Sequence, residues 1–310
     1  QSNLGQKTWA PSAVPLELGT MSKRFATPHA MPPGVIEEVI QRFANTARLG
    51  EQAGFTGVEI HAAHGYLLSQ FLSPLTNQRT DEWGGPLENR ARLLLEIVKA
   101  VRAVVSVDFA VAVKLNSADF QRGGFTTEDA KKVVKWLNDL GVDMVELSGG
   151  SYEVPAMQGD ARDGRTLARE AYFVEFARDL QTVAKMPVMV TGGIRRRAVA
   201  ESVVQSGVDM VGIGTALAID PHLPRDWLQG KDNAPQLPPI TWKNKAIASL
   251  ANMAVVKFQL RKLSRAKKPD PSVSPLRALI VQQLFMAYRT RQYRKWIEMS
   301  AHDKGLGDAR

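Results

Sequence analysis

Apolar and polar residues alternate along residues 35–213 in a repeating order: an amphipathic helix, a short turn, a short apolar run, and a polar or glycine-rich loop. In the first repeat, apolar positions spaced three and four residues apart predict a helix over 35–53, which Gly54 ends. The apolar run 57–60 is too short for a helix and predicts a strand. This order is typical of a chain that alternates helices with strands.

The same order continues through four more repeats. Helices are predicted at 87–105, 126–140, 169–184 and 197–206, and strands at 109–115, 143–147, 187–190 and 209–213. The strands are mostly continuous apolar runs, as in buried parallel sheets. The pattern predicts an α/β fold with right-handed crossovers, either a doubly wound sheet or a (β/α)8 TIM barrel. We favour the barrel because a polar or glycine residue follows each strand, at the end where barrels place their active sites.

A complete barrel needs eight strands, and this chain shows five. Residues 1–34 are proline-rich and weakly patterned, so they cannot supply three more. Residues 235–240 are predicted to form a linker, followed by helices over 242–263 and 275–298. We therefore predict two domains, a partial barrel at 1–230 and a basic helical C-terminal extension at 231–310.

Composition narrows the possible chemistry. The chain has no cysteine, which excludes disulfides, thiolate catalysis and iron–sulfur clusters with cysteine ligands. It contains no apolar run of about 18 residues and no recognisable signal peptide. We expect a cytoplasmic protein.

Charge is distributed unevenly. The net charge is +9, yet residues 231–310 hold 16 Lys and Arg against 5 Asp and Glu, so residues 1–230 carry −2. A basic extension of this kind is either a solvated helical appendage or a module that docks on an anionic surface. We expect no nucleic acid as partner and keep a peripheral membrane contact as the alternative.

Two histidines follow the first predicted strand. His61 and His64 could bind zinc, but a catalytic zinc site needs a third protein ligand and none is apparent, so we predict no metal. The remaining interpretations are structural histidines or a pair of hydrogen-bond donors for a carbonyl or nitro oxygen, and we favour the donors. Tyr66, five residues after His61, is then a candidate proton donor rather than a packing residue.

Further candidates end the later strands. Lys114 follows an apolar run and points either to water or to an anionic group, such as the pyrimidine edge of a reduced flavin. Gly193 lies after the fourth predicted strand, and Gly214 and Thr215 after the fifth. Glycine turns after the last two strands of a barrel favour a bound phosphate. The sequence contains no Rossmann fingerprint and no Walker loop.

The segments 54–74, 77–85 and 89–92 resemble the signature of the Old Yellow Enzyme family, the FMN-dependent NADH:flavin oxidoreductases and ene-reductases. The resemblance covers residues 1–230 and implies a (β/α)8 barrel that holds FMN noncovalently. It implies hydride transfer from NAD(P)H through FMN to a small electrophilic substrate, an activated alkene or a related electron-poor acceptor such as a nitro group, a quinone or dioxygen. In that family the stretch similar to residues 1–15 follows strand three, so we expect strands four to eight here.

The resemblance also implies roles for individual residues. His61 and His64 correspond to the donors that hold the substrate oxygen, Tyr66 to the proton donor, and Lys114 to the basic residue beside the flavin. Gly193, Gly214 and Thr215 correspond to the FMN phosphate site, although the family usually has arginine where Thr215 stands, which implies a weaker or rearranged contact. Five polar residues are expected to fix loops rather than to act in catalysis: Asn77, Arg79, Asp81, Asn89 and Arg92. The rival hypothesis is an incomplete barrel without activity.

Overall fold

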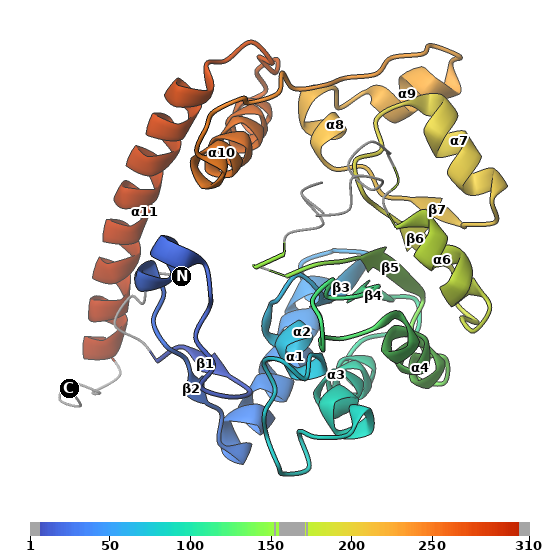
Figure 1. Cartoon of the computed structure of the whole chain (residues 1–310), viewed down its shortest axis with the longest axis vertical. Coiled ribbons are helices and arrows are strands. Elements are labelled where there is room, and N and C mark those ends of the chain that lie inside the picture. The colour runs from blue at the N-terminus through green and yellow to red at the C-terminus, as the bar shows by residue number, and fades with distance from the viewer. Residues whose placement is uncertain (1–6, 152, 155–170, 172, 304–310) are drawn as a thin grey trace. The chain divides into compact units, whose positions relative to one another are not determined.

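A parallel sheet is the central feature of the computed structural model, which describes residues 7–151, 153–154, 171 and 173–303 (Figure 1). The sheet has five strands, and neighbours in the sheet follow one another in chain order. The strands are β3 (Gly57–Ala62), β4 (Ala110–Asn116), β5 (Met144–Ser148), β6 (Val188–Val190) and β7 (Met210–Val211).

The helices that connect these strands are α1 (Pro33–Gln52), α3 (Leu87–Arg102), α4 (Thr127–Leu137), α6 (Val174–Gln181) and α7 (Arg197–Gln205). A doubly wound sheet reverses its strand order at one point, whereas this sheet keeps one order throughout. The winding is therefore that of a (β/α)8 barrel, as predicted, with five of its strands in the described part of the chain.

The two faces of the sheet differ in burial. On β4, Val111, Val113 and Leu115 are fully buried in the core between the sheet and the helices. Ala112 and Lys114 alternate with them and are only half-buried. Because successive side chains of a strand point to opposite faces, Lys114 lies on the face that forms the interior of a barrel.

Local sequence signals account for several element ends. The Thr126 side chain accepts the backbone N–H of Asp129, and the Asp129 carboxylate accepts the N–H of Thr126, which forms the predicted capping box at the start of α4. Helix α6 is shorter than the predicted 169–184, and part of that predicted start lies outside the described residues.

The end of β3 differs from the prediction. The sequence pattern ended the first strand at Ile60 and placed His61 in the following loop, which is wrong. β3 continues through Ala62, with His61 paired to Lys114 and Ala62 to Leu115. His61 is therefore held by the sheet and shares the inner face with Lys114.

The N-terminal segment contains structure that its weak pattern did not predict. It forms a short parallel pair and a 3-10 helix, β1 (Trp9–Ala10), β2 (His29–Ala30) and η1 (Gly19–Arg24). A further helix, α2 (Leu67–Leu72), follows Tyr66 directly.

Contacts divide the chain into two compact units, residues 1–194 with 198–213, and residues 195–197 with 214–310. The second unit contains α8 (Thr215–Ile219), α9 (Leu223–Leu228), α10 (Lys245–Leu263) and α11 (Pro275–Asp303). The two predicted C-terminal helices are present, and α10 packs on α11 around Ala254, Val255 and Ala278. No helix among the described residues is long and apolar enough to cross a membrane. The predicted domain boundary at residue 230 stays a prediction.

Candidate active site

Three rings converge in the turn that leads from β3 to α2. The His61 ring lies 5.0 Å from that of His64 and 4.9 Å from that of Tyr66, both in edge-on geometry. The turn is tight because His64 and Gly65 both adopt the left-handed region, with φ of 63° and 73°. The Tyr66 side chain is 44% exposed, so it is accessible to a ligand.

A buried asparagine at the end of β4 holds this turn in place. The Asn116 Oδ1 atom accepts the backbone N–H of His64 at 3.1 Å. Its Nδ2 donates to Ser69 Oγ, Asp119 Oδ1 and the carbonyl of Gly150, at 3.3, 3.1 and 2.9 Å. Four hydrogen bonds on one buried amide fix the backbone conformation of His64, a role that the sequence did not reveal.

Both histidines are neutral at neutral pH. Burial, followed by the positive charge of Lys114, lowers the pKa of His61. Burial, followed by His61 and Lys114, lowers the pKa of His64 to about 4. The His61 Nδ1 atom accepts the backbone N–H of Ala63 at 3.2 Å, so the ring hydrogen of His61 lies on Nε2. His64 Nε2 shares a hydrogen bond of 2.7 Å with Ser148 Oγ.

Lys114 is bound by carboxylates on both neighbouring strands. Its Nζ lies 3.0 Å from Glu59 Oε2 on β3 and 2.9 Å from Glu146 Oε2 on β5. Burial opposes the charge of Lys114, but hydrogen bonds to Glu146 and Glu59 outweigh it and raise the pKa of Lys114. Burial, followed by a hydrogen bond with Glu59, raises the pKa of Glu146 to about 7.

The sequence did not reveal Glu59 and Glu146 as partners of Lys114. It led us to expect that Lys114 points to water or to an anionic ligand. A signal was present, since each glutamate interrupts an apolar strand run. Strand register decides the contact, because Lys114 pairs with Glu146 across β4 and β5. The cluster carries one negative charge with both carboxylates ionised and none when Glu146 is protonated.

The predicted phosphate residues belong to different units. Gly192 and Gly193 follow β6 with φ of 122° and 72°, values that favour glycine. Gly214 immediately precedes α8, and Thr215 is its first residue. Gly193 lies in the first compact unit, whereas Gly214 and Thr215 lie in the second. Their joint role at a phosphate stays a prediction.

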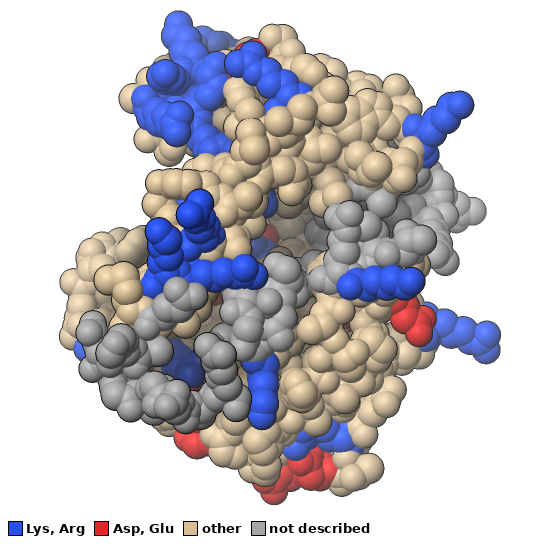
Figure 2. All heavy atoms as spheres, turned by 90° about the vertical axis from the view of Figure 1, so that its left-hand side faces the viewer, with Lys and Arg blue, Asp and Glu red and all other residues tan. Residues whose placement is uncertain are grey.

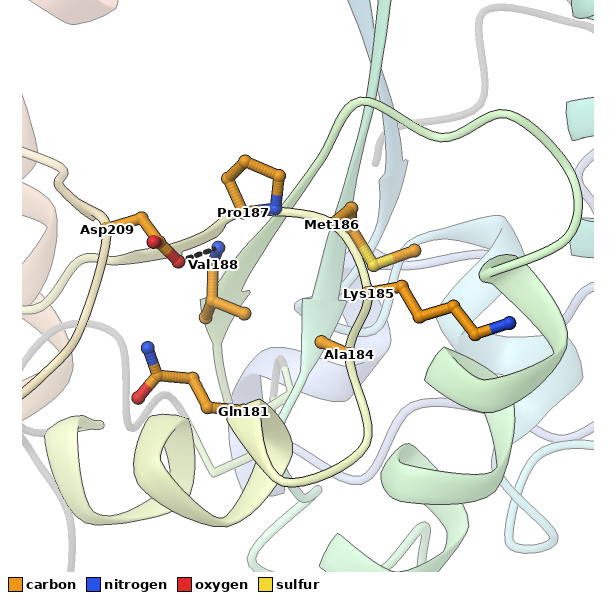
Figure 3. A pocket seen from close by; sticks show the side chains of 7 residues that line it. All are labelled: Gln181, Ala184, Lys185, Met186, Pro187, Val188 and Asp209. Carbon is orange, nitrogen blue, oxygen red and sulfur yellow. Dashed lines mark hydrogen bonds between the residues drawn. The ribbon is translucent and has the colours of Figure 1, made fainter.

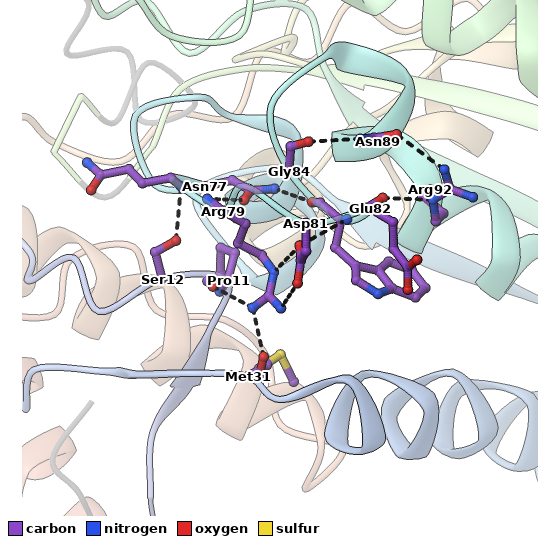
Figure 4. Close-up of polar contacts among 12 residues, drawn as sticks. Pro11, Ser12, Met31, Asn77, Arg79, Asp81, Glu82, Gly84, Asn89 and Arg92 are labelled. Carbon is purple, nitrogen blue, oxygen red and sulfur yellow. Dashed lines mark hydrogen bonds and ion pairs between the residues drawn. The ribbon is translucent and has the colours of Figure 1, made fainter.

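Arg79 ties the loop after α2 to the N-terminal segment (Figure 4). Its Nη1 donates to the carbonyls of Pro11 and Met31 at 3.0 and 2.7 Å, and its guanidinium pairs with Asp81. Asn77 Nδ2 lies within the same loop and donates to the carbonyls of Phe71 and Trp83, both at 2.8 Å. These contacts fix loops, as the sequence predicted.

The remaining two polar residues act in the same way. Asn89 Nδ2 donates to the carbonyl of Gly84 at 3.1 Å, and Arg92 Nε donates to the carbonyl of Glu82 at 2.8 Å (Figure 4). Both connect α3 to the loop before it.

Two cavities lie at opposite ends of the strands. A cavity of about 720 Å³ is enclosed by the N-terminal segment and by the loops after β3, β4 and β5, which contribute Gly65, Asp119 and Ser151. Its volume is that of a small-molecule site. The other cavity, of about 290 Å³, lies at the amino end of β6 beside Pro187 and Asp209, away from the histidines (Figure 3). The described residues contain no group of three metal-ligating side chains.

The sequence model of the NADH:flavin oxidoreductase / NADH oxidase family matches residues 4–233. The chain belongs to this family. It is 40% identical over 235 residues to the NADH-dependent flavin oxidoreductase iliE of Neonectria sp. (strain DH2), covering 71% of this chain and 30% of that protein. It is 38% identical over 216 residues to an NADPH dehydrogenase of Geobacillus sp. (strain WCH70), covering 69% and 59%.

Solved structures of this family show the same fold. A 2-naphthoyl-CoA reductase complex matches with a TM-score of 0.65 and 32% identity, over 73% of this chain and 33% of that one. The old yellow enzyme homologue from Zymomonas mobilis matches with a TM-score of 0.60 and 25% identity, over 76% and 64%. The predicted relationship to the Old Yellow Enzyme family and the barrel fold are confirmed.

Family membership also bears on the cofactors. The curated relatives include NADH-dependent flavin oxidoreductases and NADPH dehydrogenases, which together with the family model confirms FMN with NAD(P)H as the cofactors of the family. This chain spans 30% of the first relative and 59% of the second, so the activity of the whole protein is a matter for proposal.

Proposed function

We propose that this chain forms the substrate-activating side of an FMN-dependent oxidoreductase that uses NAD(P)H to reduce an activated alkene. The observation that carries the proposal is the cluster in which the His61 ring lies 5.0 Å from the ring of His64 and 4.9 Å from that of Tyr66. Two neutral N–H donors beside an accessible phenol are the groups needed to hold a substrate oxygen and to protonate a neighbouring carbon.

The residues present fit the cofactor that the family implies. FMN, when bound, supplies the hydride. Lys114 would donate a hydrogen bond to the pyrimidine edge from the inner face of the sheet, and because Glu59 and Glu146 pair with its ammonium, the cluster as a whole would bring no net positive charge to the flavin. Gly193, Gly214 and Thr215 are the candidate phosphate residues.

Each side chain of the cluster has a separate task. His61 and His64 donate N–H groups to the carbonyl oxygen of the substrate, and their lowered pKa values keep them neutral for this task. Neutral donors polarise the carbonyl without placing a second positive charge beside Lys114. Tyr66 delivers a proton from its hydroxyl to the α-carbon of the alkene.

The visible absorption spectrum of the purified chain tests the cofactor first. A bound-flavin band supports the proposal, and a colourless folded chain contradicts it. With flavin bound, an α,β-unsaturated ketone, a nitroaromatic, a quinone and dioxygen are compared as acceptors under NADH and NADPH. Preference for any acceptor over the ketone would overturn the alkene assignment.

The Tyr66→Phe variant then tests the proton donor. We expect alkene reduction to fall by about 100-fold or more while flavin reduction by NAD(P)H keeps its rate. Unchanged alkene reduction with normal flavin reduction would remove Tyr66 from the mechanism.

A further inference from the structure

The hairpin of α10 and α11 concentrates positive charge. Between Lys257 and Lys295 the sequence has eleven Lys and Arg and a single acidic residue, Asp270. Within this stretch, as far as the structure describes it, one ion pair is present, from Lys262 to Asp270 at 4.0 Å. Most of this charge is therefore not neutralised by carboxylates of the hairpin.

The charge gathers where the two helices meet. Figure 2 shows Lys and Arg side chains clustered at the top of the view, over the α10–α11 turn, and further basic side chains lower on the same face. In the turn itself, Arg265, Lys267 and Lys268 are all exposed. We call these three residues the basic turn.

The same hairpin exposes an apolar stripe. Helix α10 directs Ala254 and Val255 into its contact with α11. On another face, large apolar side chains are between 42% and 51% exposed and spaced three and seven residues apart: Leu250, Met253 and Leu260. The spacing places them along one side of the helix.

Helix α11 adds exposed aromatic side chains. The side chains of Tyr288, Tyr293 and Trp296 are all exposed, and Trp296 is 60% exposed. The rings of Tyr293 and Trp296 stack with centroids 5.7 Å apart. Tyrosine and tryptophan are enriched where a protein meets the boundary between lipid headgroups and acyl chains.

We propose that the α10–α11 hairpin docks peripherally on the surface of an anionic phospholipid bilayer. The basic turn supplies the attraction to anionic headgroups, and the apolar stripe with Trp296 enters the interfacial layer. Neither helix is apolar enough to cross the bilayer, so the contact is on the surface.

The positive charge and the exposed apolar side chains of the hairpin favour a lipid surface over nucleic acid or a second copy of this chain. Large aliphatic residues have no counterpart on a phosphate backbone, so Leu250, Met253 and Leu260 do not serve nucleic acid binding. A second copy of this chain would bring the same cationic surface against itself, which costs several kcal/mol through like-charge repulsion. A bilayer with anionic headgroups satisfies both the charge and the apolar surface.

Sedimentation of the full chain with vesicles tests the proposal. Vesicles of phosphatidylcholine mixed with phosphatidylglycerol are expected to carry the protein down, and added salt is expected to release it. Vesicles of phosphatidylcholine alone are expected to bind far less. Absence of binding to the mixed vesicles, or equal and salt-insensitive binding to both, overturns the proposal.

Two variants separate the contributions. Replacing Arg265, Lys267 and Lys268 by Gln on the exposed turn is expected to weaken vesicle binding about 100-fold, since each cation near the surface contributes about fivefold. Trp296→Gln is expected to weaken binding at every salt concentration. Lys132→Gln, an exposed lysine of α4, is the matched control and is expected to change nothing.

Two other results would also contradict the lipid assignment. One is tighter binding to duplex DNA or RNA than to the mixed vesicles at the same salt concentration. The other is a dimer in analytical ultracentrifugation that Trp296→Gln dissociates, because the exposed apolar surface would then serve a second copy.

Discussion

The Asn116 side-chain amide accepts the backbone N–H of His64 at 3.1 Å, and so connects the end of β4 to the turn that follows the neighbouring strand β3. The two residues are 52 positions apart in sequence. Because a buried amide with all its hydrogen bonds formed is costly to disturb, the conformation of the His64 turn depends on the end of β4.

Asn116→Leu removes all four hydrogen bonds while keeping a similar volume. We expect the free energy of unfolding to fall by about 2–4 kcal/mol and the pKa of His64 to rise toward the ordinary value as the turn loosens. Urea denaturation measures the first effect and NMR titration of the histidine ring the second.

A matched control separates the site from general stability. Asn138, which follows the last residue of α4, also makes two hydrogen bonds to backbone groups, of Val183 and Lys185, and neither belongs to the turn of the histidines. Asn138→Leu is expected to lower stability without changing the His64 titration. If both variants shift that titration equally, Asn116 has no special role at the site.

Glu146 makes stability depend on pH near neutrality. Its pKa of about 7 in the folded state exceeds the usual 4.5. A carboxyl group with a raised folded-state pKa contributes stability that is complete below the unfolded-state pKa and is lost as pH rises through the folded-state pKa. Between about pH 6 and pH 8 the loss is on the order of 1 kcal/mol.

Glu146→Gln removes this titration. Relative to the variant, the wild type is expected to lose that stability between about pH 6 and pH 8, as measured by urea denaturation at each pH. Glu128→Gln is the control, because Glu128 is exposed and pairs only with its helix neighbour Lys131 in the described structure. A parallel pH profile for wild type and Glu146→Gln would show that Glu146 does not titrate in this range.

We expect the burial of His64 to make the folded protein less stable in acid. Its pKa is lowered from 6.5 to about 4. A group with a depressed folded-state pKa contributes stability that is present above the unfolded-state pKa and is lost as pH falls through the folded-state pKa. His64→Asn is therefore expected to lose less stability than the wild type between pH 6.5 and about 4, by up to about 3 kcal/mol. Equal losses in the two proteins would mean that His64 is not buried as a neutral ring.

The sequence predicted much of this fold because its signals are local. Helix periodicity, short apolar runs and the Thr126 capping box each depend on residues close in the chain. The two extra strand residues, His61 and Ala62, were missed because neither they nor the following Ala63 carry a strand signal. Alternation left a doubly wound sheet and a barrel open, and the polar and glycine residues after each strand favoured the barrel order that the sheet has.

The electrostatics of the site could not be predicted in the same way. Lys114 and Glu59 are 55 residues apart, and His64 and Ser148 are 84 residues apart. Such pairs form only once the strand register is set, and no local pattern specifies that register between strands separated by a helix. The histidines and Tyr66 could be singled out because they lie within one turn.

Arg79 holds the N-terminal segment to the loop after α2. Its buried guanidinium donates to two backbone carbonyls and pairs with Asp81, whose pKa is lowered chiefly by the hydrogen bond from Arg79. Arg79→Met keeps an unbranched, flexible side chain but removes every side-chain donor. We expect it to reduce the free energy of unfolding by about 2–4 kcal/mol, since two carbonyls lose their partner.

Arg92→Met is the control for Arg79→Met, because Arg92 is exposed and donates to a carbonyl of the same loop. Its cost is expected to stay below about 1 kcal/mol. Limited proteolysis of the two variants then reports on the segment itself: cleavage before Met31 is expected to accelerate in Arg79→Met alone, because that arginine holds the carbonyls of Pro11 and Met31. Equal cleavage of both variants would mean that the large cavity, whose wall includes this segment, does not depend on Arg79.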